Sequence, residues 1–191
     1  MLRDIVIRNR SYRRFHQDHA IEREELRELV DLARLSASGA NMQPLKFFIS
    51  WEPKMNARIF PCLGWAAYLK DWPGPVEGER PSAYVIILHD TRIATNYWCD
   101  HGIAAQSILL GAAEKGLGGC MIASIRKKEL VEALSIPEYL DVLLVLALGR
   151  PCEEVRIEPV AEDGSIRYWR DDAGVHHVPK RSLDEIVIER F

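Results

Sequence analysis

The chain has few cysteines and no pair of them at the spacing of a redox or zinc motif. Its four cysteines are Cys62, Cys99, Cys120 and Cys152, and none belongs to a Cys-x-x-Cys. This absence argues against a structural zinc site and against a thioredoxin-like redox pair. Because no disulfide framework is indicated, a reducing cytoplasm is the expected location.

The sequence also lacks an excess of one charge and lacks a long apolar run. The formal net charge is −3 over 191 residues, which argues against a nucleic-acid-binding protein. No apolar run is long enough to span a bilayer, and Met1-Leu2-Arg3-Asp4 has no signal-peptide pattern. Since 48% of the residues are hydrophobic, we expect one folded domain, 1–191, that binds neither a membrane nor nucleic acid.

Several signatures of catalysis and metal binding are missing. There is no Gly-x-Ser-x-Gly and no Gly-x-Gly-x-x-Gly, so no nucleophile elbow and no Rossmann fingerprint is indicated. The pairs His16-x-x-His19 and His176-His177 have no cysteine or carboxylate at a recognised ligand spacing. They are interpreted as surface or turn histidines, no metal site is predicted, and the catalytic residue stays unknown.

Hydrophobic spacing predicts alternating helices and strands. We expect a short first helix, two short helices around Pro61 and a capping box at Ser182 and Glu185. Gly116 is predicted to end the longest helix, and Ser124 to cap the next one. Periodicity alone favours a layered α/β or α+β domain and leaves the topology open. The longer predicted helices are 22–35, 93–115 and 124–134; the strands are 46–51, 83–89, 119–123 and 141–148.

Three polar clusters, far apart in the chain, are the most informative feature present. They are Arg10-Ser11-Tyr12-Arg13-Arg14-Phe15, Ser38-Gly39-Ala40-Asn41-Met42-Gln43-Pro44 and Lys180-Arg181-Ser182-Leu183-Asp184-Glu185. The arginine guanidinium groups and serine hydroxyls in the outer two clusters can donate hydrogen bonds to a phosphate. Amide side chains in the middle cluster donate and accept hydrogen bonds. Together they offer what a flavin nucleotide requires, an anion site and a polar site for the ring edge.

The clusters also resemble motifs of one family. The first is similar to R-R-S-x-R-x-F, with Asn9 for the first arginine, and the second to A-P-S-x-x-N-x-Q-P-W, with Ala37 and Leu45 as departures. Residues 116–122, 148–151 and 180–187 continue the order. The chain therefore resembles the nitroreductase family of FMN flavoproteins over nearly its whole length.

The resemblance implies a fold and an assembly. The fold is α+β and nitroreductase-like, with a mostly antiparallel central sheet wrapped by helices. The assembly is a homodimer with flavins at the interface, and a C-terminal extension of each chain reaches the partner subunit. The apolar Ile186-Val187-Ile188 and Phe191 suit that role, because a free terminus is usually polar.

The same resemblance implies which residues contact FMN. The phosphate would be held by Arg10, Ser11 and Arg13 and by one of Lys180 and Arg181. The ribityl chain and ring would meet Ser38, Asn41 and Gln43. Backbone groups of one segment would lie at the reactive edge of the ring: Met121, Ile122, Ala123 and Ser124. A solvated helix end, ordinary turn chemistry and a capped strand end are the alternative interpretations of these three sets.

The aromatic residues Trp65, Tyr68 and Trp72 lie in a stretch with proline and glycine. They are predicted either to close over the ring and select flat substrates or simply to pack in the core or an interface.

The resemblance implies an FMN-dependent NAD(P)H oxidoreductase. NADH or NADPH would reduce the flavin, and a small acceptor, a flat aromatic, quinone or nitro compound, would reoxidise it. Two alternatives stay open. One is a different reaction on the same fold, either reductive dehalogenation or flavin fragmentation, and the other is a flavin-binding redox sensor without turnover.

Overall fold

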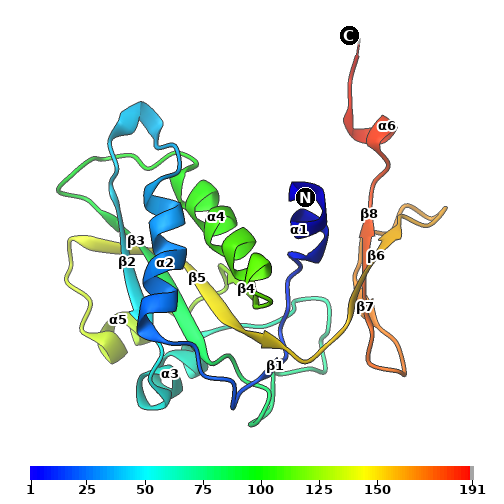
Figure 1. Cartoon of the computed structure of the whole chain (residues 1–191), viewed down its shortest axis with the longest axis horizontal. Helices are drawn as coiled ribbons and strands as arrows, with labels where there is room; N and C mark the ends of the chain where they lie inside the picture. Colours follow the sequence, from blue (N-terminus) through cyan, green and yellow to red (C-terminus); the bar gives the residue numbers. More distant parts are fainter. Residues whose placement is uncertain (190–191) are drawn as a thin grey trace.

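The centre of the molecule is an antiparallel sheet. The computed structural model describes residues 1–189, and Figure 1 shows its arrangement. The strands run in the order β2-β3-β5, and both β1 and β4 pair with β5. Every pairing in this sheet is antiparallel, which confirms the mostly antiparallel sheet predicted from the sequence. Its strands are β1 (Phe15–His16), β2 (Leu45–Ser50), β3 (Ala83–Asp90), β4 (Gly118–Ile122) and β5 (Leu140–Pro151).

Helices cover both faces of this sheet. β3 is buried along its whole length, and its successive side chains point to opposite faces. Val85 and Ile87 pack in one core with α2 (Arg23–Arg34) and α4 (Asp100–Glu114). Tyr84 and Ile86 pack in a second core with residues of α3 (Pro53–Ile59) and α5 (Lys127–Leu134). The sheet therefore separates two apolar layers, as its nearly continuous hydrophobic strands require.

The first half of the chain largely follows the predicted elements. α1 (Leu2–Arg8) is the short first helix, and α2 buries Leu26, Leu29 and Ala33 at helical spacing. α3 gives way to the 3₁₀ turn η2 (Phe60–Cys62), which contains Pro61. A second 3₁₀ turn, η1 (Gly39–Asn41), lies between α2 and β2.

The longest helix begins later than predicted. α4 starts at Asp100, whereas the spacing predicted a start near Ile93. Trp98 has a φ of +36°, a left-handed conformation that a helix cannot contain. The other end agrees with the prediction, because α4 stops at Glu114 and Gly116 adopts a φ of +76°.

The prediction that Ser124 caps a helix was wrong. α5 begins at Lys127, and the segment before it is paired in a strand-like way. The Gly64 amide donates to the Ser124 carbonyl at 2.8 Å, and Leu63 and Ile125 form an antiparallel bridge. This non-local pairing holds residues 124–126 extended and moves the helix start by two residues or more.

A second, smaller sheet follows β5, and sequence periodicity did not indicate it. It consists of β6 (Val155–Pro159), β7 (Trp169–Arg170) and β8 (His176–Lys180), in which β8 lies between a parallel β6 and an antiparallel β7. The interpretation of His176-His177 as surface or turn histidines was wrong. Both lie on β8, His176 is 1% exposed, and His177 contacts Glu158 and Asp171.

The chain ends away from the main body. α6 (Leu183–Ile186) has the predicted capping box between Ser182 and Glu185. Beyond β8 the backbone projects outward, as Figure 1 shows. Phe191, part of the predicted apolar tail, lies outside the described residues. Within 1–189, no helix combines the length and hydropathy needed to cross a membrane.

Candidate functional site

The N-terminal cluster is fastened to β4. Ser11 and Gly119 form a parallel bridge, and the Tyr12 amide donates to the Gly119 carbonyl at 3.0 Å. Gly119 has no room for a side chain, because a Cβ atom there would lie 2.6 Å from the Ala147 carbonyl oxygen. This close packing brings residues 10–13 beside the end of β4.

Three cations meet in one cavity beside this bridge. Arg10, Arg13 and Lys180 line a space of about 300 Å³ that contains no carboxylate in its wall. None of the three forms an ion pair with any part of the chain that the structure describes. Like charges that converge without a counter-charge destabilise a protein unless an anion joins them. The cavity therefore has the electrostatics of an anion site; its other lining residues include Asn9, Ser11, Gln106, Met121, Tyr168 and His176.

Arg10 is partly desolvated in this position. Its Nη2 donates to the Val6 carbonyl at 2.7 Å, whereas its buried Nε has no partner among the described residues. Burial lowers the pKa of the Arg10 guanidinium from its usual value, and nearby Tyr12 opposes that shift. A guanidinium stays protonated in proteins, so the unpartnered Nε is a donor that an anion would satisfy.

Arg13 is held by contacts on both its backbone and its side chain. Its Nη1 donates to the Ser11 carbonyl at 3.1 Å and lies 3.3 Å from His176 Nε2. The guanidinium also lies 5.0 Å from the centre of the Tyr168 ring. The Glu153 side chain, 1% exposed, forms an ion pair with Arg170 at 2.8 Å and accepts a hydrogen bond from the Arg13 amide. Arg13 thus has little freedom to move away from the cavity.

A second cavity adjoins the first and shares Arg13, Met121 and Tyr168 with it. It measures about 230 Å³, and its wall includes the predicted backbone segment Met121, Ile122, Ala123 and Ser124. The pairing of Gly64 with Ser124 forms one side of this cavity. A Cβ atom at Gly64 would lie 2.5 Å from Ser124 Oγ and 3.1 Å from Ser124 Cβ, so the glycine lets the two segments pack closely. The cationic cavity therefore opens toward an extended backbone segment, as an elongated ligand with one anionic end would require.

The predicted aromatic residues do not all reach this space. Trp65 lines the second cavity, and its buried Nε1 has no partner within the described chain. The Tyr68 ring lies 4.9 Å from the Tyr168 ring, and the Tyr68 amide donates to the Tyr168 hydroxyl at 3.3 Å. Tyr68 itself does not line the second cavity. Trp72 lies under the Arg170 guanidinium at 4.9 Å. Trp72 is half-buried and lines neither cavity, whereas Trp65 borders the second one.

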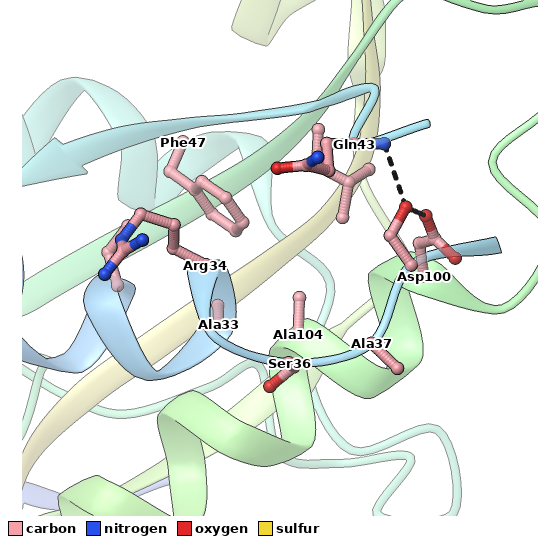
Figure 2. A pocket seen from close by; sticks show the side chains of 11 residues that line it. Ala33, Arg34, Ser36, Ala37, Gln43, Phe47, Asp100 and Ala104 are labelled. Atoms are coloured by element: carbon pink, nitrogen blue, oxygen red, sulfur yellow. Dashed lines mark hydrogen bonds between the residues drawn. The ribbon is translucent and has the colours of Figure 1, made fainter. Parts of the chain in front are cut away.

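The middle polar cluster lies elsewhere in the subunit. Ser38 and Gln43 line a separate cavity of about 260 Å³ between α2, β2 and α4, which shares no lining residue with the other two (Figure 2). Asn41 lines none of the three. Within one chain, the structure therefore does not bring Ser38, Asn41 and Gln43 to the cationic cavity.

The loop that carries these residues is strained and tied to α4. Ala40, Asn41 and Gln43 have φ values of 48°, 55° and 51°, in the left-handed region. Buried Asp100 accepts hydrogen bonds from Ser38 Oγ at 2.6 Å and from the Gly39 amide at 2.8 Å. The Gln43 amide in turn donates to Ser38 Oγ at 2.9 Å. Figure 2 draws these side-chain bonds as dashed lines between the labelled Gln43 and Asp100. Strain of this kind persists where surrounding contacts impose it, often at binding sites.

The two C-terminal cations differ in their surroundings. Lys180 lines the cationic cavity, whereas the Arg181 guanidinium pairs with Glu185 at 3.3 Å and lines neither cavity. This difference favours Lys180 as the residue that faces the anion site.

Four residues of the site were missed by sequence reasoning: Asp100, Glu153, Tyr168 and His176. Asp100 had a signal, since an acid at the start of a helix faces the positive end of its dipole. The other three lie on or near the small second sheet, which no local pattern indicated. The pairing of β1 with β5 brings Glu153 to Arg13, and the pairing of β8 with its neighbours positions Tyr168 and His176.

Comparison with known proteins agrees with this geometry. A model of the nitroreductase family matches residues 7–150. A protein of Methanothermobacter thermautotrophicus, described as an NADH dehydrogenase or NAD(P)H nitroreductase, is 27% identical over 155 residues, which cover 78% of this chain and 76% of that protein. The solved structure of a nitroreductase family protein from Streptococcus pneumoniae superposes with a TM-score of 0.71 at 16% identity, and each chain is covered completely.

A third relative is the FMN-dependent nitroreductase of Clostridium difficile. Its structure has a TM-score of 0.65 at 24% identity, covering 78% of this chain and 87% of that one. At these low sequence identities, the structural superpositions establish the shared fold. The family match covers the N-terminal motif, the middle cluster and the central sheet. The chain belongs to the nitroreductase family of oxidoreductases.

Proposed function

We propose that this chain is an FMN-dependent NAD(P)H oxidoreductase that passes electrons to a small, flat acceptor. The observation that carries the proposal is the convergence of Arg10, Arg13 and Lys180 in a cavity without a carboxylate, which adjoins the cavity lined by the backbone segment 121–124. The FMN dependence of the Clostridium difficile relative supports it.

The residues present fit FMN on physical grounds. A phosphate monoester carries a charge of about −1.5 to −2 near pH 7, which three cations and the Ser11 hydroxyl would balance. The unpartnered Arg10 Nε would gain an acceptor. The 121–124 segment would offer backbone groups to the polar edge of the ring, and Trp65 would border the ring's face.

In this proposal the chain positions the flavin and shields it from water, and the flavin carries the redox chemistry. When bound, FMN accepts hydride from a nicotinamide and delivers electrons to the acceptor. Arg10, Arg13 and Lys180 anchor the phosphate, and Trp65 limits the access of water on one side. No acid or base side chain is required, so no catalytic side chain is assigned.

We also propose that the site is completed in a homodimer. Ser38 and Gln43 line a different cavity from the cations, so a second copy would have to bring them to the flavin. The described tail is apolar and uncovered: Leu183, Ile186 and Ile188 are 69%, 62% and 67% exposed. A groove of about 530 Å³ along edge strand β2 and α2 has an apolar floor that includes Phe47, Phe48 and Ile49, and its wall also contains charged residues of α2. Such a tail would cover those apolar side chains on a partner.

Flavin binding is the first test. FMN added to flavin-free protein should be bound with quenched fluorescence, at one FMN per subunit. Arg10→Ala and Arg13→Ala should each weaken FMN about tenfold to a hundredfold, because each removes hydrogen bonds to a charged group. Riboflavin, which lacks the phosphate, should be nearly insensitive to both changes.

The matched control is Arg156→Ala, since Arg156 pairs with Glu154 on the exposed side of the small sheet. Its affinity for FMN should equal that of the original protein. A protein that shows no quenching with FMN contradicts the proposal.

Turnover is the second test, because it separates an enzyme from a flavin-binding sensor. NADH or NADPH, added in the absence of oxygen, should bleach the flavin absorption at a rate fast enough to support catalytic turnover. Quinones and nitroaromatic compounds should then restore the absorption. Flavin that stays oxidised with both nicotinamides would exclude the proposed activity while leaving flavin binding intact.

A further inference from the structure

His176 forms part of the wall of the cationic cavity although nothing in the proposed function assigns it a role. It is the first residue of β8, and its side chain is buried with 1% exposure. It contacts Arg13, which is 163 positions away in the sequence. The Tyr168 ring lies 5.1 Å from the imidazole and fixes one side of it. His177, the next residue, belongs to a different environment, in contact with Glu158 and Asp171.

The contact with Arg13 determines which imidazole nitrogen carries the proton. Arg13 Nη1 lies 3.3 Å from His176 Nε2. A guanidinium has donors and no acceptor, so Nε2 must accept this hydrogen bond and cannot hold a proton. In the neutral ring the proton is then on Nδ1.

The surroundings also keep the ring neutral. Burial, followed by the positive charges of Arg13 and Arg170 and by His177, lowers the pKa of His176 to about 4. Near pH 7 His176 is therefore an uncharged ring with one donor and one acceptor.

The donor on Nδ1 has no partner. This atom is buried, and no acceptor of the described chain lies within hydrogen-bond distance of it. A buried donor without a partner destabilises the folded state, so native structures rarely contain one without a reason. The cavity that His176 lines is the one with three uncompensated cations, which need an acceptor of negative charge.

We propose that His176 is a phosphate-binding residue, held by Arg13 as the Nδ1–H tautomer so that it donates a hydrogen bond to a phosphoryl oxygen of FMN. The inference rests on the proposed function. It adds a neutral donor to the three cations and a role for the second sheet, which carries His176 and Lys180 on the same strand. Arg13 then acts twice, on the anion and on the tautomer of its neighbour.

Two amide substitutions separate the two nitrogens. The amide of His176→Asn overlies Nδ1 and keeps a donor for the phosphate, whereas that of His176→Gln overlies Nε2 and keeps only the contact with Arg13. His176→Asn should bind FMN more tightly than His176→Gln by about tenfold, the effect of one hydrogen bond to a charged group. His177→Gln is the matched control, and its affinity for FMN should be unchanged.

The pattern with riboflavin identifies the acceptor. His176→Gln should weaken FMN and leave riboflavin within about twofold, because only FMN has the phosphoryl oxygen. Equal weakening of both flavins would place the acceptor on the ribityl chain and overturn the proposal, as would equal affinity of the Asn and Gln variants for FMN.

A measurement on the unmodified protein avoids any question of variant folding. With ¹⁵N-labelled histidine, the nitrogen shifts of His176 should show the Nδ1–H tautomer, and FMN should shift the Nδ1 signal. An Nε2–H tautomer, or a signal that FMN leaves in place, would refute the inference. Failure of the original protein to bind FMN would instead refute the proposed function itself.

Discussion

At the scale of single residues, buried polar groups organise the site more than the exposed charges do. Asp100 is 4% exposed and accepts hydrogen bonds from Ser38 and Gly39. Glu153 similarly fixes the backbone of Arg13 and Arg14. In both cases a buried carboxylate holds a loop that bears candidate ligand contacts. Removal of such an acceptor leaves partly buried donors unpaired, which costs more than the hydrogen bond contributes.

Asp100→Ala should therefore lower the free energy of unfolding by about 2–3 kcal/mol, because it leaves the Ser38 hydroxyl and the Gly39 amide without their acceptor. Asp100→Asn keeps one acceptor and should lose less. Urea denaturation monitored by circular dichroism measures both. Asp172→Asn, at an exposed position, is the control and should change stability little. Equal stability of Asp100→Ala and this control would show that the loop does not depend on Asp100.

His176 should make the protein less stable in acid. Its pKa is about 4 in the folded protein and 6.5 in a model peptide, so between these values the unfolded chain binds a proton that the folded chain does not. Stability from this group is complete above pH 6.5 and falls as the pH drops toward 4. The fall between pH 7 and pH 5 should be smaller in His176→Gln by about 2 kcal/mol. Parallel pH profiles of the two proteins would mean that the histidine titrates normally.

At the scale of elements, strand β4 connects the two cavities. One end pairs with Ser11, and residues from Met121 onward form the wall of the second cavity. β5 supports β4 through five register pairs, from Gly118 with Gly149 to Ile122 with Val145. Close packing of glycine against this support lets the N-terminal cluster approach.

Gly119→Ala should disturb β4 and the cavity together, since its Cβ would lie 2.6 Å from a carbonyl oxygen. A loss of about 1–3 kcal/mol in unfolding free energy is expected from such overpacking, with weaker FMN binding. Gly102→Ala is the matched control within α4, where a Cβ meets no atom within 4 Å. It should stabilise the protein by about 0.5–1 kcal/mol through helix propensity. The same stability for both variants would contradict the close packing at β4.

At the scale of the whole molecule, the subunit has a compact body and an outlying C-terminal segment (Figure 1). Apolar side chains on that segment are exposed, and the edge strand β2 contributes apolar side chains to a groove on the body whose wall also contains charged residues of α2. Both features are costly in an isolated subunit and favourable in a symmetric dimer.

Truncation after Pro179 should damage both assembly and flavin retention, because it removes the apolar tail and Lys180. A second truncation, after Arg181, keeps Lys180 and removes only the tail. Light scattering should show loss of the dimer in both proteins, and flavin content should be lower in the shorter one. A stable dimer after either truncation would show that the tail does not hold the two subunits together.

Much of the fold followed from local patterns in the sequence. The burial pattern of α2, the end of α4 at Gly116 and the capping box at Ser182 depend on residues within a few positions of one another. The ordered motifs indicated the family, and the family match over residues 7–150 confirms it. Those motifs also named the candidate phosphate residues, of which Arg10, Ser11, Arg13 and Lys180 line one cavity.

Only the tertiary structure decided how these parts meet. The start of α4 at Asp100 and the extended segment at Ser124 reflect non-local hydrogen bonds that override local propensity. The second sheet, and with it the contact of Arg13 with His176, joins residues 163 positions apart. The separation of Ser38 and Gln43 from the cations is likewise a property of the packed subunit. Sequence alone determined which chemical groups are present, because composition and spacing are local; their partners were decided by folding, because strand pairing and burial are not.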